Sequence, residues 1–490
     1  MKRPALILLS AILSILCFAP ANLFFLAPFA LTPAVMALCE EPSAKRRMLY
    51  GWCAGFVYWF GVCYWIRDVL AQYGGMHPAL VWLAFLLFCI LRSLHWAAFG
   101  LLAGYVTESR IGVIAIAALW TGLERCYGPF GFAWLVLGNA GIPMDVPMRI
   151  APFSGVYGLS FLFAMTGTAL AFAIRKRPRI VHAPVLMLPV LFLLPALPEL
   201  ETGREIAVAA QPDIQERPRW TAKDIETALD RMTVQTREAG SSMKARPNLV
   251  LWPEMPAPFY YDDDPMLRAK AAALATSMQS DFLFGGVAHT AKRESLNSVF
   301  HVGADGALVS RYDKMNLVPF GEYTPPWVSW VGQVTQEVGG FIPGERSDNL
   351  PAGGGKAGVF ICYESVFPHY IRKFALDGAG VLVNLSNDGY FGRSAAREQH
   401  LAIARMRAVE NRRWLLRATN DGISAVIDPA GRITQRLPPF VATATVMRYN
   451  NRADLSFYTR NGDWFVWGCL LVGCACCLRS RLTKPKPESL

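Results

Sequence analysis

The distribution of apolar residues divides this chain into two kinds of segment. Long apolar stretches recur through the first 200 residues and return once near the C-terminus, whereas residues 205–450 contain only short apolar runs. A helix needs roughly 20 mostly apolar residues to cross a bilayer. On that basis about eight membrane spans are expected, at 4–19, 22–39, 49–66, 78–106, 111–128, 152–174, 184–198 and 463–478.

The short apolar runs between 205 and 450 are rich in β-branched and aliphatic residues and alternate with helix-like stretches. This alternation predicts a layered α/β domain. The fold class expected is thus a polytopic α-helical membrane bundle over 1–200, an α/β domain over 205–450 and a C-terminal membrane helix over 463–478. Strands are expected at 206–211, 248–252, 281–287, 298–302, 358–362, 381–384, 414–419 and 424–428, and helices near 221–238, 264–279, 367–377 and 398–412.

Composition and charge agree with a membrane protein. Hydrophobic residues make up 53% of the 490 residues, and the mean hydropathy is +0.28. The net charge of +11 comes from short basic clusters beside the apolar stretches and forms no long stripe, so nucleic acid is not an expected partner. The clusters lie at 2–3, 45–47, 110, 175–179 and 479–486.

These clusters precede the first expected span and follow the second, fourth, sixth and last. Cytoplasmic loops carry such an excess of lysine and arginine. Both termini are therefore expected in the cytoplasm. Seven spans from a cytoplasmic N-terminus then place the α/β domain on the other side of the membrane.

The cysteines separate in the same way. Ten of the 11 lie in or beside the apolar stretches, where a cysteine usually acts as a small apolar side chain. Only Cys362 belongs to the α/β domain, so it has no partner there for a disulfide. Such a thiol is either buried and inert or retained for its reactivity, and the polar residues after it, Tyr363–Glu364–Ser365, favour reactivity.

Three expected strand ends carry candidate chemistry. Glu254 follows the run 248–252, Lys314 follows Arg311–Tyr312–Asp313, and Cys362 ends the run 358–362. A thiol attacks an acyl carbonyl as thiolate, a carboxylate can remove its proton, and a cation can stabilise the oxyanion that forms. Each residue alone is weak support, since most glutamates and lysines at strand ends are simply solvated.

The sequence around these residues is more specific. Trp252–Pro253–Glu254, the segment from Lys314 to Glu322, and Cys362–Tyr363–Glu364 resemble the three signature blocks of the nitrilase, or carbon–nitrogen hydrolase, superfamily. The membrane stretches and the segment 384–392 narrow the resemblance to the apolipoprotein N-acyltransferase family, and it extends over nearly the whole chain.

The resemblance implies a nitrilase-like αββα sandwich facing the periplasm and a location in the bacterial inner membrane. It implies transfer of an acyl chain from a phospholipid to the α-amino group of the lipid-modified N-terminal cysteine of a lipoprotein. Glu254 would be the general base, Lys314 the oxyanion stabiliser and Cys362 the nucleophile that becomes a thioester. The implied partners are the phospholipid donor, the lipoprotein acceptor and the bilayer.

Further residues are assigned by the same resemblance. Glu322, Glu364 and Tyr363 match supporting residues of the active site, and Trp220 matches a tryptophan near the substrate entrance. Tyr390, expected to contact substrate, stands where the family pattern has a tryptophan. Asp421 stands where a second asparagine is usual, and neither departure falls on Glu254, Lys314 or Cys362.

Other interpretations remain open at this stage. A membrane-tethered amidase would use the same three residues and pass the acyl group to water, and a scaffold protein would carry an idle nitrilase-like domain. The aromatic and glycine-rich segment 323–344 suits either a membrane-facing lid or an ordinary loop. No metal or cofactor is expected, because His289, His301 and His400 lack metal-ligand spacing and no glycine-rich phosphate loop is present.

Overall fold

The computed structural model divides the chain into two compact units. It describes residues 2–73, 77–126, 132–176, 183–215, 219–243, 245–323 and 340–483. The first unit combines Met1–Ala71, Met76–Leu197 and Asn461–Leu490, and the second combines Gln72–Gly75 and Pro198–Arg460. Most of the expected lid segment, 324–339, lies outside the described residues.

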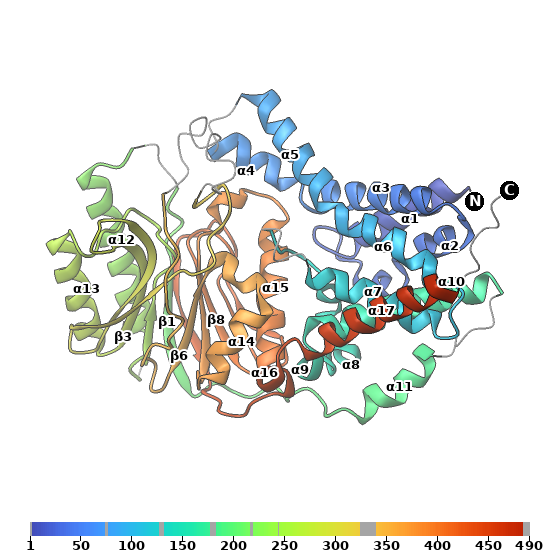
Figure 1. Ribbon diagram of the computed structural model, residues 1–490. Helices are drawn as coiled ribbons and strands as arrows, with labels where there is room; N and C mark the ends of the chain where they lie inside the picture. The colour runs from blue at the N-terminus through green and yellow to red at the C-terminus, as the bar shows by residue number, and fades with distance from the viewer. Residues whose placement is uncertain are drawn as a thin grey trace. The chain divides into compact units, whose positions relative to one another are not determined.

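The first unit is helical (Figure 1). The helices that contribute to it are α1 (Arg3–Leu16), η1 (Phe24–Phe29), α2 (Thr32–Glu40), α3 (Ala44–Val62), α4 (Trp65–Tyr73), α5 (Pro78–Arg92), α6 (Leu94–Val106), α7 (Gly112–Arg125), η3 (Leu137–Gly141), α8 (Asp145–Met148), α9 (Ala151–Ser154), α10 (Val156–Ile174), α11 (Ala183–Leu193) and α17 (Trp464–Thr483).

Three helical segments among the described residues are long and apolar enough to cross a membrane: Pro78–Val106, Val156–Ile174 and Trp464–Leu482. The stretch 22–39 is not one continuous α-helix: it contains η1, which has Pro28 inside it, and then α2, which has Pro33 in its first turn. The stretch 78–106 is divided at Ser93, where α5 ends and α6 begins. The helical character of this unit is confirmed, while the number of spans stays a prediction.

Small residues allow close helix packing in this unit. A methyl group on Gly51 of α3 would lie 2.1 Å from the carbonyl oxygen of Trp96 in α6, and one on Gly100 would lie 2.4 Å from that of Arg47. The two helix backbones therefore touch, as in other membrane helix pairs that carry small residues at their contact.

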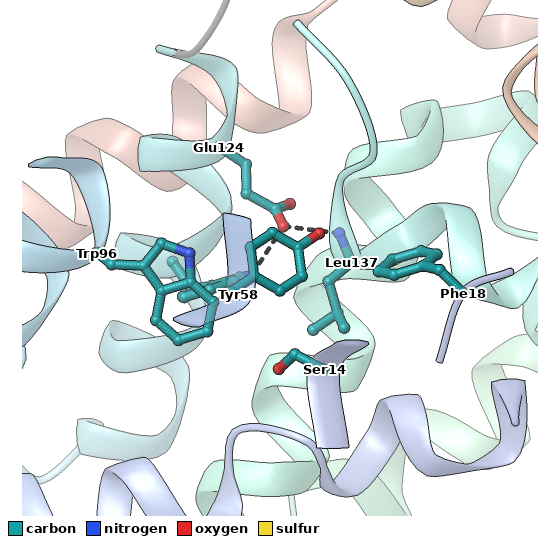
Figure 2. A pocket seen from close by; sticks show the side chains of 7 residues that line it. Ser14, Phe18, Tyr58, Trp96, Glu124 and Leu137 are labelled. Atoms are coloured by element: carbon teal, nitrogen blue, oxygen red, sulfur yellow. Dashed lines mark hydrogen bonds between the residues drawn. The ribbon is translucent and has the colours of Figure 1, made fainter. Parts of the chain in front are cut away.

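A buried carboxylate joins α7 to the segment that follows it. Glu124 Oε1 accepts hydrogen bonds from Trp120 Nε1 at 3.0 Å and from the backbone N–H of Leu137 at 2.8 Å. Figure 2 shows this carboxylate at a small cavity, which Tyr58, Trp96 and Ser14 also line. An acidic residue in such apolar surroundings must be well paired to be tolerated, and here it fixes the start of η3.

The second unit contains two β-sheets. One has the strand order β11-β1-β2-β3-β4-β5 and the other β10-β9-β8-β7-β6. Their strands are β1 (Glu205–Gln211), β2 (Leu249–Leu251), β3 (Asp281–His289), β4 (Ser295–Val302), β5 (Leu308–Asp313), β6 (Ala357–Ile361), β7 (Val381–Ser386), β8 (Trp414–Thr419), β9 (Ala425–Ile427), β10 (Ile433–Arg436) and β11 (Thr443–Tyr449).

Helices cover the outer faces of both sheets (Figure 1). α12 (Ala222–Ser241) and α13 (Pro265–Met278) lie on the side of β1 and β3, and α14 (Pro368–Leu376) and α15 (Ala396–Asn411) lie on the side of β6 and β8. The inner faces pack through contacts of β1 and β11 with β8. The short helix α16 (Phe457–Asn461) follows the last strand. This is the expected αββα sandwich.

Parallel strands set the position of the candidate site within this unit. β1, β2 and β3 run parallel in one sheet, and β6, β7 and β8 run parallel in the other. Side chains that follow such strands gather at the carboxyl edge of their sheet. Glu254 follows β2 and Cys362 follows β6, so each lies at that edge.

Candidate active site

Glu254 is buried and is held by donors from both sheets. Its Oε1 accepts hydrogen bonds from Asn297 Nδ2 at 2.8 Å and Lys314 Nζ at 3.1 Å. Its Oε2 accepts one from the backbone N–H of Asn387, after β7, at 2.9 Å. A side chain on Gly285 of β3 would meet the Glu254 backbone at 2.6 Å, so glycine permits this close approach. The carboxylate is thereby fixed in one orientation.

Lys314 lies between two carboxylates. Its Nζ donates to Glu254 Oε1 at 3.1 Å and to Glu322 Oε1 at 2.9 Å, and its side chain is only 1% exposed. Burial alone would lower the pKa of Lys314, but the negative charges of Glu254 and Glu322 outweigh burial and hold that pKa well above its ordinary value. The ammonium group therefore stays charged at neutral pH and can stabilise an oxyanion.

Glu322 orients this lysine through bonds of its own. Its Oε1 also accepts from Asn297 Nδ2 at 2.7 Å, and its Oε2 accepts from the backbone N–H of Val318 at 2.7 Å. Asn297 of β4 thus donates to both carboxylates that flank Lys314. The ion pairs and the amide together hold the three charged groups in a fixed geometry.

Cys362 stands in a strained turn directly after β6. Its φ of 48° lies in the left-handed region, which costs a non-glycine residue on the order of 1–3 kcal/mol. Burial, and then the charge of Glu254, raise the pKa of its thiol, whereas Lys314 and a hydrogen bond with Ser386 lower it. Burial prevails, so the resting sulfur is a thiol and needs a base when it reacts.

Glu364 connects the turn at Cys362 to the segment after Lys314. Its Oε1 accepts from the backbone N–H groups of Met315 and Asn316 at 2.9 and 3.0 Å. Its Oε2 accepts from the N–H of Ile361 at 2.8 Å and from the hydroxyl of Tyr312 at 2.6 Å. Although burial raises the pKa of Glu364, these donors all favour a carboxylate that fixes lysine and cysteine relative to each other.

Comparison with known proteins decides the family. Residues 10–169 match the model of the apolipoprotein N-acyltransferase N-terminal domain, and residues 207–449 match that of carbon-nitrogen hydrolase. The chain is 33% identical to an apolipoprotein N-acyltransferase of Geobacter metallireducens, over 94% of this chain and 92% of that one. It is 31% identical to one of Nitrosomonas europaea, over 92% of each chain. The chain belongs to the apolipoprotein N-acyltransferase family.

A solved structure gives a weaker likeness. The nitrilase-superfamily member Nit3 of Saccharomyces cerevisiae is 18% identical and covers 52% of this chain and 93% of its own, with a TM-score of 0.41. Membership of the apolipoprotein N-acyltransferase family rests on the sequence relatives.

The remaining residues expected from this family lie outside the charged cluster. Tyr363 is buried beside Cys362, with its ring edge-on to Phe367 at 5.3 Å. Trp220 is partly buried against the apolar core beneath the first sheet. Tyr390, in η6 (Asp388–Phe391), is 41% exposed. The substrate contacts of Trp220 and Tyr390 stay predictions.

Several residues of the site were not expected from sequence. Asn297 donates to both carboxylates, Asn387 donates its backbone N–H to Glu254, and Tyr312 donates to Glu364. Asn297 directly precedes the expected strand 298–302, and this position was the available sequence signal for it. Nothing in the sequence pairs Asn387 with Glu254, which lies 133 residues away.

Proposed function

We propose that this chain transfers an acyl chain from a phospholipid to the N-terminal α-amino group of the diacylglyceryl-cysteine of lipoproteins, by way of a thioester on Cys362. The observation that carries the proposal is the buried ion-pair cluster of Lys314, Glu254 and Glu322 beside a solitary thiol. The membership of the apolipoprotein N-acyltransferase family supplies the substrate classes.

In the first half-reaction, Glu254 accepts the proton of Cys362 as the sulfur attacks the ester carbonyl of the phospholipid. Lys314 stabilises the oxyanion of the tetrahedral intermediate. The C–O bond then breaks, and Glu254 returns the proton to the departing alkoxide, which leaves as a lysophospholipid alcohol. The thioester keeps the acyl group activated for transfer.

In the second half-reaction, the free amine of the lipoprotein attacks the thioester carbonyl. Glu254 accepts a proton from the attacking nitrogen while Lys314 again stabilises the oxyanion. The C–S bond breaks, and the proton passes to the departing thiolate. An amide on the lipoprotein and the resting thiol of Cys362 result.

Lys314 keeps its positive charge throughout the reaction because it is paired with Glu322 as well as with Glu254. With two carboxylates around one ammonium, proton transfer from Lys314 to Glu254 is disfavoured, since Lys314 retains Glu322 as a partner.

Membrane topology is proposed from the basic clusters. The two units are assigned to a membrane bundle with a C-terminal helix, and to a domain of about 205–450 on the periplasmic side of the inner membrane, with both termini in the cytoplasm. A tag placed after Leu490 is expected to be protected from protease added to intact spheroplasts and cleaved after lysis. A tag in the exposed turn at Asp305 should be cleaved in both cases, and cleavage of the Leu490 tag in intact spheroplasts would contradict this topology.

Mass spectrometry of the purified protein tests the reaction. After incubation with phospholipid alone, the protein should be heavier by one acyl chain on Cys362, and hydroxylamine should remove that mass. A diacylglyceryl peptide with a free N-terminal amine should discharge the thioester and gain the acyl chain, whereas the same peptide with an acetylated N-terminus should not.

Two outcomes would argue against the proposal. An adduct on a membrane cysteine would exclude Cys362 as the acyl carrier. Discharge of the thioester by water as fast as by the free amine would favour an amidase.

A further inference from the structure

A second buried polar cluster contacts the backbone of Cys362. His400 of α15 lies with its Nε2 3.1 Å from the backbone carbonyl oxygen of Cys362 and 2.9 Å from Ser365 Oγ. Its Nδ1 lies 3.0 Å from Arg417 Nη2 and 3.1 Å from Asp388 Oδ1. All these side chains are buried.

The chemistry of the partners assigns the proton of the imidazole. Burial, and then the positive charge of Arg417, lower the pKa of His400, which is therefore neutral at neutral pH. A carbonyl oxygen only accepts hydrogen bonds, so Nε2 carries the hydrogen and donates it to Cys362. Nδ1 is then an acceptor and takes a hydrogen bond from Arg417.

Asp388 anchors this arrangement. Arg417 Nη2 lies 2.8 Å from both carboxylate oxygens of Asp388, and its charge outweighs burial and lowers the pKa of that carboxyl. Asp388 also accepts a hydrogen bond from Ser386 Oγ at 2.9 Å, and Ser386 in turn interacts with the Cys362 thiol. Asp388 is therefore connected to Cys362 in two ways. Arg417 and His400 link it to the carbonyl oxygen of Cys362, and Ser386 links it to the sulfur.

We propose that His400, held by Arg417 and Asp388, is a positioning residue that fixes the peptide group between Cys362 and Tyr363. This inference rests on the proposed role of Cys362. The C=O and N–H of a trans peptide point in opposite directions, so the bond from His400 also sets the direction of the Tyr363 N–H. The strained φ of 48° at Cys362 needs surrounding contacts to persist, and this hydrogen bond is one of them.

The test compares three variants at His400 in the full-length protein. His400→Phe keeps a ring but loses both nitrogens, and it should slow thioester formation by about 30- to 100-fold, since small misplacements of reacting groups cost up to about 100-fold. His400→Gln places an amide N–H near the position of Nε2 and should stay within about fivefold of the wild-type rate. His400→Asn, which is too short to reach the carbonyl, should resemble His400→Phe. KM for phospholipid should not change in any of them.

His301 supplies a matched control. It is 1% exposed in β4, and it contacts Ser310 Oγ at 3.0 Å and Asp281 Oδ1 at 3.2 Å without touching the nucleophile. His301→Phe should lower the melting temperature about as much as His400→Phe but leave the rate of thioester formation unchanged.

The results separate the proposals. A rate for His400→Phe within twofold of the His301→Phe rate would overturn the positioning role. If His400→Phe does not fold, equal rates for His400→Gln and His400→Asn would overturn it instead. If Cys362→Ala still forms the acyl adduct, the proposed function itself fails, whatever the His400 variants do.

Discussion

Replacing Cys362 with serine is expected to lower the rate of acyl transfer by at least about 10⁴-fold, comparable to removing the nucleophile of other acyl-transfer enzymes. A hydroxyl is much harder to deprotonate than a thiol, and Glu254 must remove that proton in surroundings that already raise the pKa of the thiol. Single-turnover transfer from a radiolabelled phospholipid to a diacylglyceryl peptide measures the effect.

The control for this substitution is a cysteine that takes no part in the reaction. Cys53 of α3 is free and exposed, and Cys53→Ser should transfer acyl groups at the wild-type rate. The melting temperature of Cys362→Ser should also stay close to that of the wild type, because the change is small in volume. Transfer by Cys362→Ser within tenfold of the wild-type rate would rule out Cys362 as the nucleophile.

Replacing Lys314 with methionine is expected to reduce both activity and stability. The loss of the oxyanion stabiliser should lower the rate of thioester formation by about 10²- to 10³-fold. Glu254 and Glu322 would then face each other without a cation, and breaking a buried ion pair in this way costs about 3–5 kcal/mol. Thioester formation by mass spectrometry and thermal unfolding in detergent report the two effects separately.

The stability of the Lys314→Met protein should depend on pH because of the two carboxylates, Glu254 and Glu322. Without the ammonium, their repulsion raises the pKa of one of them in the folded state above its unfolded value. Such a group contributes stability below its unfolded pKa and loses that contribution as the pH rises through its folded pKa. The stability deficit should therefore shrink as the pH is lowered.

Two further variants complete this comparison. Adding Glu322→Gln to Lys314→Met removes one of the facing charges, so it should recover part of the stability and none of the activity. Lys270, whose ion pair with Asp230 is at the surface, provides the control, because Lys270→Met should cost less than about 1 kcal/mol. A Lys314→Met protein as stable as Lys270→Met would contradict the buried ion-pair cluster.

The sequence predicted those residues of the site that belong to short motifs. Glu254 and Cys362 each follow an apolar run, Lys314 follows Arg311–Tyr312–Asp313, and all three lie after a strand in the structure. The eight expected strand segments all contain a strand, because buried strands leave continuous apolar runs. β5, β10 and β11 were not predicted, because most of their residues are partly or fully exposed, which leaves no continuous apolar run.

The residues that were missed act through tertiary contacts. His400 lacks metal-ligand spacing, and its role depends on the carbonyl oxygen of Cys362, 38 residues earlier in the chain. Asp388 entered the sequence analysis only as part of the segment 384–392, yet its carboxylate accepts hydrogen bonds from Arg417 and Ser386. Such roles follow from how strands and helices pack, and a sequence alone does not state that packing.

The protonated state of the Cys362 thiol also affects how easily the enzyme is oxidised. Oxidants attack thiolates far more readily than thiols, and the proposed topology places the domain in an oxidising compartment. A sulfur that burial keeps protonated until substrate arrives is protected from sulfenic acid formation. Burial of Cys362 therefore makes a base necessary for catalysis and also protects the resting enzyme from oxidation.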